Sequence, residues 1–599
     1  MALGRIFVRR LQLALTAAAL AAVFALAPAA SAQESRVPVT GLPSSLNAEL
    51  RRLLREEAEP QSLFDARRQA ERAAATVARL VESEGYYAAE VEPWAEGVTI
   101  FGRGVRVATG PLFIINSSRI DYLGAPPDDT TRVELDTLLD PLQPGVPAAA
   151  APVLETEDAL LLRLRAAGYP EARAEPVDAL ADGEAHTMDF AFQLQAGNRA
   201  SFGNLRISGL ERTRLDFVQS LQPWRPGERY SPQRLDEFRN RLAETGIFDS
   251  AIARLASEGQ SAGGEVLSRD VEVELIEGKR RTIALGAAAS TSEGAGVEAE
   301  WEVRNFSGRG DSITVAAQLA TLQRRFETIY RRPHVGEYGR NVRLGVTIED
   351  FETDAFNQTG GDISASVEEQ LTPRLRGSLG VQAGYASIED QQTRVLQTGR
   401  RDLYILSGTG TAEYIGVRDV LDPANGVRAR VSIEPGLTYG DTTIAFSRLS
   451  GEASLYGELG SERLVGALRG RVGTIVGPNG APPDRLFFAG GGGSVRGYEY
   501  QSLSPRNASG DLIGGRSLVE ASAEVRWRAG ERLGYVAFMD AGAAGPNVEP
   551  PIDEMRAGVG LGVRYYAGFG PLRADIAIPL DKRDGDADFQ IYISIGQAF

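Results

Sequence analysis

The chain has 599 residues, enough for several domains or one very large one. Its formal net charge of −16 argues against a nucleic-acid partner, and the absence of cysteine excludes disulfides and thiolate metal sites. Because only two histidines occur, His186 and His334, we expect neither a bound cofactor nor an enzyme that depends on histidine or a metal ion.

Residues 1–32 have the pattern of a secretory signal peptide. Three arginines within residues 5–10 precede an apolar run at residues 11–26 and an A-x-A cleavage site at residues 30–32. We therefore expect a mature chain that begins at Gln33, in preference to an uncleaved membrane anchor. No later run of apolar residues is long enough for a transmembrane helix, so a membrane-embedded protein would have to be a closed β-barrel.

The next part of the chain, residues 33–280, contains a motif that recurs about every 80 residues. A run with helical periodicity ends at a glycine, an aromatic or apolar residue follows, and a strand begins; these glycines are Gly85, Gly168 and Gly246. Each unit is expected to have the order βααββ, in which two helices cover one face of a small sheet. The expected helices are residues 44–57, 65–84, 156–167 and 232–245, and the expected hairpin of the first unit joins 98–101 to 105–108 across 102–104.

This repeated unit resembles the POTRA domain, a periplasmic module that precedes certain outer-membrane barrels. The predicted domains are residues 33–111, 112–198 and 199–280, and the alternative is three unrelated α+β domains. The resemblance implies that the units receive client proteins by adding a strand to an exposed sheet edge, such as residues 205–207.

From residue 281 to residue 599 helical periodicity disappears, and the sequence consists of short segments of alternating apolar and polar residues separated by turns. At about 20 residues for each strand and its turn, this length predicts a transmembrane antiparallel β-barrel of roughly 16 strands. The final segment places its apolar residues on one face, as a membrane-spanning strand does: Phe589, Ile591, Ile593, Ile595 and Phe599. The alternative is a soluble β-sandwich, which the aromatic C-terminal residue disfavours.

A glycine-rich stretch at residues 489–498 ends in Val495, Arg496, Gly497 and Tyr498. By itself the stretch is compatible with a flexible surface loop whose arginine has no function. A phosphate-binding loop is disfavoured because no helix follows the glycines. Further along the chain come a Phe-x-Asp-x-Gly segment and a glycine-rich strand, with the residues Phe538, Asp540, Gly542, Gly558, Gly560 and Gly562.

These motifs, in this order, resemble those of the bacterial surface antigen barrels, a family that includes BamA, TamA and the two-partner secretion transporters. In that family the V/I-R-G-F/Y motif lies on a loop folded into the barrel lumen, where its arginine meets the acidic residue of an F-x-D-x-G motif. The resemblance therefore implies that Arg496 pairs with Asp540. Bidentate pairing would stabilise an otherwise poorly solvated charge.

Three POTRA-like units on a chain of this length resemble the TamA group. That resemblance implies an outer-membrane location with the POTRA domains in the periplasm, and a TamB-like, inner-membrane-anchored partner. It also implies unfolded clients such as autotransporters, contact with outer-membrane lipid, and opening between the first strand (282–289) and the last (589–599). The alternatives are a two-partner secretion transporter and a BamA-like insertase; a porin and a barrel phospholipase are disfavoured.

Overall fold

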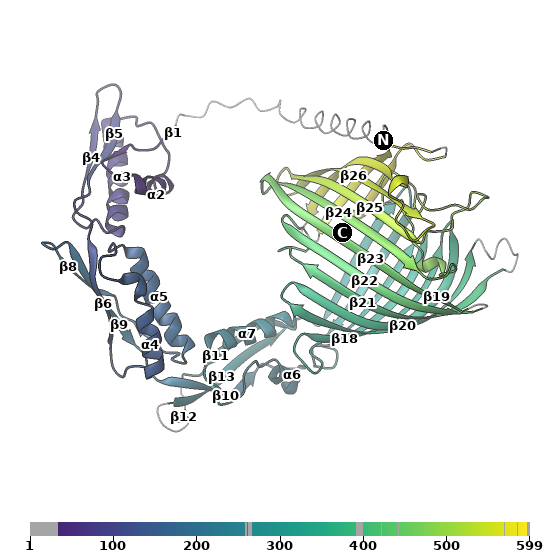
Figure 1. The fold of residues 1–599 in the computed structure, drawn as a ribbon, viewed down its shortest axis with the longest axis horizontal. Helices are drawn as coiled ribbons and strands as arrows, with labels where there is room; N and C mark the ends of the chain where they lie inside the picture. The colour runs from purple at the N-terminus through teal and green to yellow at the C-terminus, as the bar shows by residue number, and fades with distance from the viewer. Residues whose placement is uncertain are drawn as a thin grey trace. The chain divides into compact units, whose positions relative to one another are not determined.

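The computed structural model describes residues 34–257, 260–261, 266–390, 399–420, 422–440, 443–567, 570–583 and 585–595 (Figure 1). The expected signal peptide and Phe599 lie outside these residues. The chain divides into two compact units, and the one that contains the barrel also includes residues 205–223, 237–254 and 272–280. No described helix is both long and apolar enough to cross a membrane.

The first N-terminal domain packs its long helix α3 on a small sheet of order β2-β5-β4. Helix α3 begins after Ser62, whose side chain accepts a hydrogen bond from the Asp65 N–H and caps the helix. Its buried face includes Val77 and Val81, which lie in one core with Val105 of β5. The elements are β1 (Glu34–Ser35), β2 (Val39–Thr40), η1 (Ser44–Leu46), α2 (Asn47–Leu53), β3 (Glu57–Ala58), α3 (Leu63–Ser83), β4 (Glu90–Glu96) and β5 (Gly102–Ala108).

Two expectations for this domain are wrong. The helix expected at 44–57 ends at Leu53, because Leu54 is extended and the chain continues into β3. The hairpin turns at residues 97–101, where Gly97 takes a positive φ of 119°, and not at 102–104. Gly104 lies within β5, paired with Trp94, and the indole ring of Trp94 occupies the space that a Cβ at this position would need.

The second and third domains repeat the arrangement. The second sheet has the order β6-β9-β7, and the third has the order β10-β13-β11, so β10 lies at an edge as expected for residues 205–207. The helix expected at 156–167 begins earlier, at Ala150. The elements are β6 (Ile114–Tyr122), α4 (Asp129–Thr137), η2 (Asp140–Leu142), α5 (Ala150–Ala166), β7 (Arg173–Ala174), β8 (Asp178–Asp182), β9 (Thr187–Gln195), β10 (Arg199–Ser208), α6 (Leu215–Ser220), α7 (Pro232–Glu244), β11 (Phe248–Leu255), β12 (Gln260–Ser261) and β13 (Val266–Glu277).

The C-terminal part is a closed antiparallel barrel of sixteen strands, which confirms the predicted fold class and strand number (Figure 1). Closure pairs the first strand, β14, with the last, β29. The strands are β14 (Arg281–Ser290), β15 (Gly294–Arg304), β16 (Ser312–Ala320), β17 (Gln323–Arg332), β18 (Arg340–Glu352), β19 (Phe356–Thr372), β20 (Leu375–Asp390), β21 (Arg401–Ile415), β22 (Gly426–Tyr439), β23 (Ile444–Ser461), β24 (Leu464–Val476), β25 (Ser517–Arg528), β26 (Leu533–Gly545), β27 (Arg556–Ala567), β28 (Gly570–Pro579) and β29 (Gln590–Ile595).

Side chains near the end of the chain alternate between the two faces of the wall. Ile593 is 55% exposed on the outside, and Phe589 and Ile591 are also exposed. Gln590 is buried, and the Tyr592 hydroxyl contacts the loop inside the barrel. Ile595 ends β29.

The third domain is joined to the barrel through the turn between β15 and β16. The Arg214 N–H donates to the Gly308 carbonyl at 2.8 Å, and the Asn305 amide donates to the Thr213 hydroxyl at 2.7 Å. A second turn of the barrel contributes Tyr338, whose hydroxyl donates to the Glu244 carboxylate at 2.6 Å. These contacts hold residues 205–223 and 237–254, which belong to the same compact unit as the barrel, against two of its turns.

Glu277, at the end of β13, organises the segment that forms this junction. Its carboxylate accepts hydrogen bonds from the backbone N–H groups of Glu211, Arg212 and Thr213, at 3.0, 3.0 and 2.8 Å. Burial by itself would raise the Glu277 pKa, but these donors outweigh it and lower the pKa to about 2.

We expect Glu277→Gln to loosen residues 211–213, because a neutral amide accepts these hydrogen bonds less strongly. Since the pKa is lower in the folded state, the stabilisation is complete above pH 4.5 and is lost as the pH falls towards 2. The free energy of local opening at pH 7 should decrease by about 2 kcal/mol, measured by amide hydrogen exchange. Glu274→Gln, which removes a carboxylate from an exposed ion pair with Arg254, is the matched control; equal exchange in both variants would contradict the assignment.

Candidate functional site

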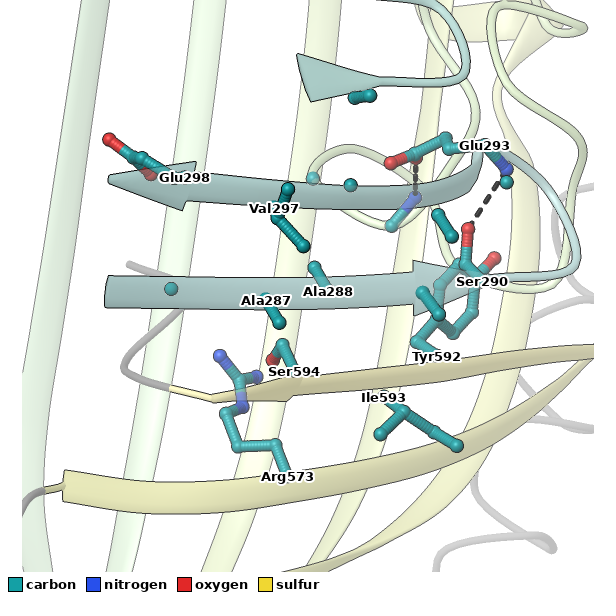
Figure 2. A pocket seen from close by; sticks show the side chains of 18 of the residues that line it. Ala287, Ala288, Ser290, Glu293, Val297, Glu298, Arg573, Tyr592, Ile593 and Ser594 are labelled. Carbon is teal, nitrogen blue, oxygen red and sulfur yellow. Dashed lines mark hydrogen bonds between the residues drawn. The ribbon is translucent and has the colours of Figure 1, made fainter. Parts of the chain in front are cut away.

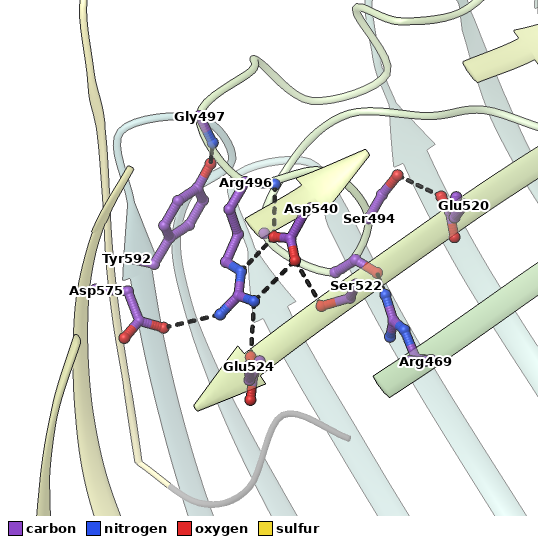
Figure 3. A network of polar contacts seen from close by, with 12 residues as sticks. Arg469, Ser494, Arg496, Gly497, Glu520, Ser522, Glu524, Asp540, Asp575 and Tyr592 are labelled. Atoms are coloured by element: carbon purple, nitrogen blue, oxygen red, sulfur yellow. Dashed lines mark hydrogen bonds and ion pairs between the residues drawn. The ribbon is translucent and has the colours of Figure 1, made fainter. Parts of the chain in front are cut away.

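The glycine-rich stretch belongs to the loop between β24 and β25, which folds back into the barrel lumen (Figure 3). Val495 and Tyr498 are fully buried in a cluster with Phe487, and the Tyr498 hydroxyl donates to the Ala557 carbonyl at 3.1 Å. Gly497 has a φ of 101°, a conformation that side chains disfavour. The loop is therefore packed against the inner side of the barrel strands and is not a flexible surface segment.

Arg496 lies at the centre of a buried ionic cluster (Figure 3). Its Nε and Nη2 contact the two carboxylate oxygens of Asp540 at 2.6 and 3.0 Å, a bidentate pairing. Nη2 also donates to Glu524 at 2.7 Å, and Nη1 lies 3.6 Å from Asp575. The guanidinium carbon lies 3.4 Å from the centre of the Phe538 ring, and the Arg496 side chain is 3% exposed. The structure thus brings together the arginine and the aspartate that the sequence motifs pointed to.

Three further arginines balance the carboxylates of this cluster. Arg526 contacts Glu524 at 2.9 Å, Arg564 forms a bidentate pair with Asp575, and Arg573 lies 3.7 Å from Asp575. Burying an ion pair costs desolvation energy that its attraction offsets only when the geometry is good, whereas removing one partner leaves a buried charge uncompensated. Removing Arg496 or Asp540 alone would therefore leave its partner as a buried charge without that ion pair.

The glycines of β27 provide the space into which the loop and its partners fit. A Cβ at Gly558 would collide with the carbonyl oxygen of Arg496, and a Cβ at Gly560 would collide with the Phe538 ring. At Gly562 the obstacle would be the Asp575 carboxylate. Gly542 of β26 likewise lies close to the Val495 side chain. Each of these predicted positions is thus adjacent to the ionic cluster.

Sequence reasoning missed Glu524, Asp575 and Tyr592. Glu524 lies opposite Phe538 in the ladder of β25 and β26, and Asp575 lies opposite Tyr592 in that of β28 and β29. The Tyr592 hydroxyl accepts a hydrogen bond from the Gly497 N–H at 3.1 Å. The strand alternation could have placed these side chains on the lumen face, but only the register shows that they meet Arg496 and its loop.

The junction between β14 and β29, which we call the seam, has a short ladder among the described residues. Three residue pairs join these strands, at Ala288, Ala289 and Ser290, whereas ten pairs join β14 to β15. Beside the seam lies a cavity of about 360 Å³, whose lining includes Arg496 and Arg573 and several small residues of β14 and β15 (Figure 2). The small side chains at this wall leave an open volume beside the loop.

We predict that Gly558→Ala displaces the loop, because its Cβ would meet the Arg496 carbonyl. The cost of such overpacking is about 1–3 kcal/mol. Trypsin should then cleave after Arg496, which is protected in the parent protein, and the released fragments can be identified by mass spectrometry. Gly470→Ala in β24 is the control, because its Cβ would meet no atom within 4 Å. Equal resistance of both variants to trypsin would contradict this explanation of Gly558.

Comparison with known proteins gives a family match and several relatives. Residues 305–599 match the Omp85 superfamily domain. The outer membrane protein assembly factor BamA of Nitratidesulfovibrio vulgaris is 26% identical over 472 residues, which cover 75% of this chain and 58% of that protein. BamA of Neorickettsia risticii is 24% identical over 419 residues, covering 67% of this chain and 55% of that protein. The chain thus spans little more than half the length of these relatives.

A solved structure shows the same fold. The crystal structure of BamA from Haemophilus ducreyi lacking POTRA domains 1–3 aligns with a TM-score of 0.67 at 19% identity, covering 81% of this chain and all of that one. The barrel, the POTRA-like domains and the outer-membrane relatives together identify an outer-membrane protein whose N-terminal domains lie in the periplasm.

Proposed function

We propose that this chain, which carries an Omp85 superfamily domain, is an outer-membrane assembly factor of the TamA type. Its clients are unfolded outer-membrane proteins, autotransporters among them, and it also supports the transfer of phospholipid to the outer membrane. Relatives named as assembly factors support the general activity. The three α+β units before the barrel favour the TamA type, with a TamB-like, inner-membrane-anchored partner in the periplasm.

The observation that carries this proposal is the short ladder of the seam. Among the described residues three pairs join β14 and β29, whereas six join β28 to β29 and ten join β14 to β15, so parting the described seam separates few ladder pairs. An opened seam presents two strand edges with unpaired N–H and C=O groups, which are templates for an incoming strand. A client strand would join by main-chain hydrogen bonds, so the process needs no covalent chemistry.

The relatives also favour a second candidate, a BamA-like insertase, because both are named BamA. The two candidates share the barrel mechanism and differ in their partners. A TamA-type protein works with a TamB-like protein, whereas a BamA-like protein works with the lipoproteins of its own complex.

Locking the seam should stop assembly. The chain has no cysteine, and Ala289 faces Ile593 across the seam, so Ala289→Cys combined with Ile593→Cys places one thiol on each strand. We expect the disulfide to form under oxidation, to lower client insertion into proteoliposomes at least about tenfold, and to be reversed by reductant. Val563→Cys combined with Ala574→Cys joins β27 to β28 and is the control. Full activity of the oxidised seam variant would contradict lateral opening.

The partner distinguishes the two candidates. Affinity purification of the tagged chain from solubilised membranes should recover a TamB-like protein in stoichiometric amount, identified by mass spectrometry. Membranes with the untagged chain provide the background. Recovery of BamA-complex lipoproteins without a TamB-like protein would replace the TamA-type assignment with the BamA-like one.

A further inference from the structure

The loop that carries Arg496 is fixed to the last strands of the barrel. Arg496 contacts Asp540 on β26 and Asp575 on β28. The Gly497 N–H donates to the Tyr592 hydroxyl on β29, which is one of the two strands of the seam. These contacts lie on β26, β28 and β29, so they attach the loop to the β29 side of the seam.

The same loop also reaches across the seam to the first hairpin. Glu293 lies in the turn between β14 and β15, and its Oε1 accepts a hydrogen bond from the Gly492 N–H at 2.7 Å (Figure 2). The Glu293 N–H donates to the Ser290 hydroxyl at 2.9 Å, which orients the turn. A carboxylate that accepts from a backbone N–H forms one of the stronger hydrogen bonds in proteins.

Gly492 lies between the two sides of the seam. A Cβ built on it would lie 3.0 Å from the Tyr592 ring and 3.5 Å from the Glu293 Oε1. One backbone segment therefore contacts a side chain of β29 and a side chain of the β14–β15 turn at once. Next to it, Thr291 and Ile591 hydrogen-bond across the seam, with the Thr291 N–H donating to the Ile591 carbonyl at 3.0 Å.

We propose that Glu293 is a clasp that holds the seam closed by binding the Gly492 N–H of the lumen loop. The clasp supplements the three pairs of the ladder, and releasing it lets the β14–β15 hairpin move away from β29 while the loop stays on the Arg496 cluster. Glu293 is thus a positioning residue for opening. This inference rests on the proposed lateral opening of the seam.

The clasp can be tested without a client, by amide hydrogen exchange of the full chain in lipid nanodiscs. Exchange of residues 281–290 and 590–595 reports the opening equilibrium of the seam directly. We expect Glu293→Ala to raise this exchange about tenfold and Glu293→Gln to raise it less, because the amide oxygen still accepts a hydrogen bond. Strands β19 and β20 are the internal reference and should be unchanged.

Two controls separate the clasp from general loosening. Glu298→Ala removes another carboxylate of the same hairpin, which lines the same cavity without a hydrogen bond to the loop among the described residues, and should not change the exchange. In an Arg496→Ala background the loop is already released, so Glu293→Ala should have no further effect. Heat-modifiable electrophoretic mobility verifies that each barrel is folded.

The outcomes distinguish the two proposals. If the parent seam exchanges faster than β19–β20 and Glu293→Ala leaves it unchanged, the clasp is wrong and lateral opening stands. Additive effects of Glu293→Ala and Arg496→Ala would also overturn the clasp, since they would act independently. If the parent seam is as protected as β19–β20 and no variant opens it, lateral opening itself is wrong.

Discussion

The buried contact between the Arg496 guanidinium and the Asp540 carboxylate is the interaction on which the arrangement of the barrel interior depends. It holds one loop against β26, while Glu524 and Asp575 extend the contact to β25 and β28. Burying an unpaired charge is costly, and a different loop position would take from Asp540 the arginine with which it forms a bidentate pair, whereas Glu524 and Asp575 would keep their other arginines. The backbone of β27 has glycine where the loop approaches, which makes this one position sterically possible.

The position of the loop also brings its backbone into contact with residues on both sides of the seam. Because Gly497 and Tyr592 are hydrogen-bonded, the loop lies beside the last strand, and its preceding glycines extend to Glu293 on the first hairpin. Within the described residues the seam has a ladder of three pairs and small residues on β14, whereas the adjoining ladders of β14 with β15 and of β28 with β29 have ten and six pairs. A closed barrel with one weak junction can be stable and still expose strand edges when that junction parts.

Much of the architecture was predictable because it follows from local periodicity. Alternation of apolar and polar residues predicted the barrel, the length of the segment predicted roughly sixteen strands, and the glycine-aromatic repeat predicted three α+β units. Local reasoning failed where a distant side chain set the backbone. In the first domain Gly104 is paired with Trp94 inside the ladder and the turn falls at Gly97, and the helix expected at 44–57 ends at Leu53, before the strand at residues 57–58.

The sequence by itself indicated the fold class and the outward face of the last strand as far as Ile593, and the resemblance of its motifs to a known family implied the pairing of Arg496 with Asp540. The tertiary structure alone decided the remaining members of the site. Glu524 and Asp575 are ordinary acidic residues in strands, and Glu293 is 199 positions from the glycine that it binds. Strand register and barrel closure bring these groups together, and neither can be read from the spacing of the residues along the chain.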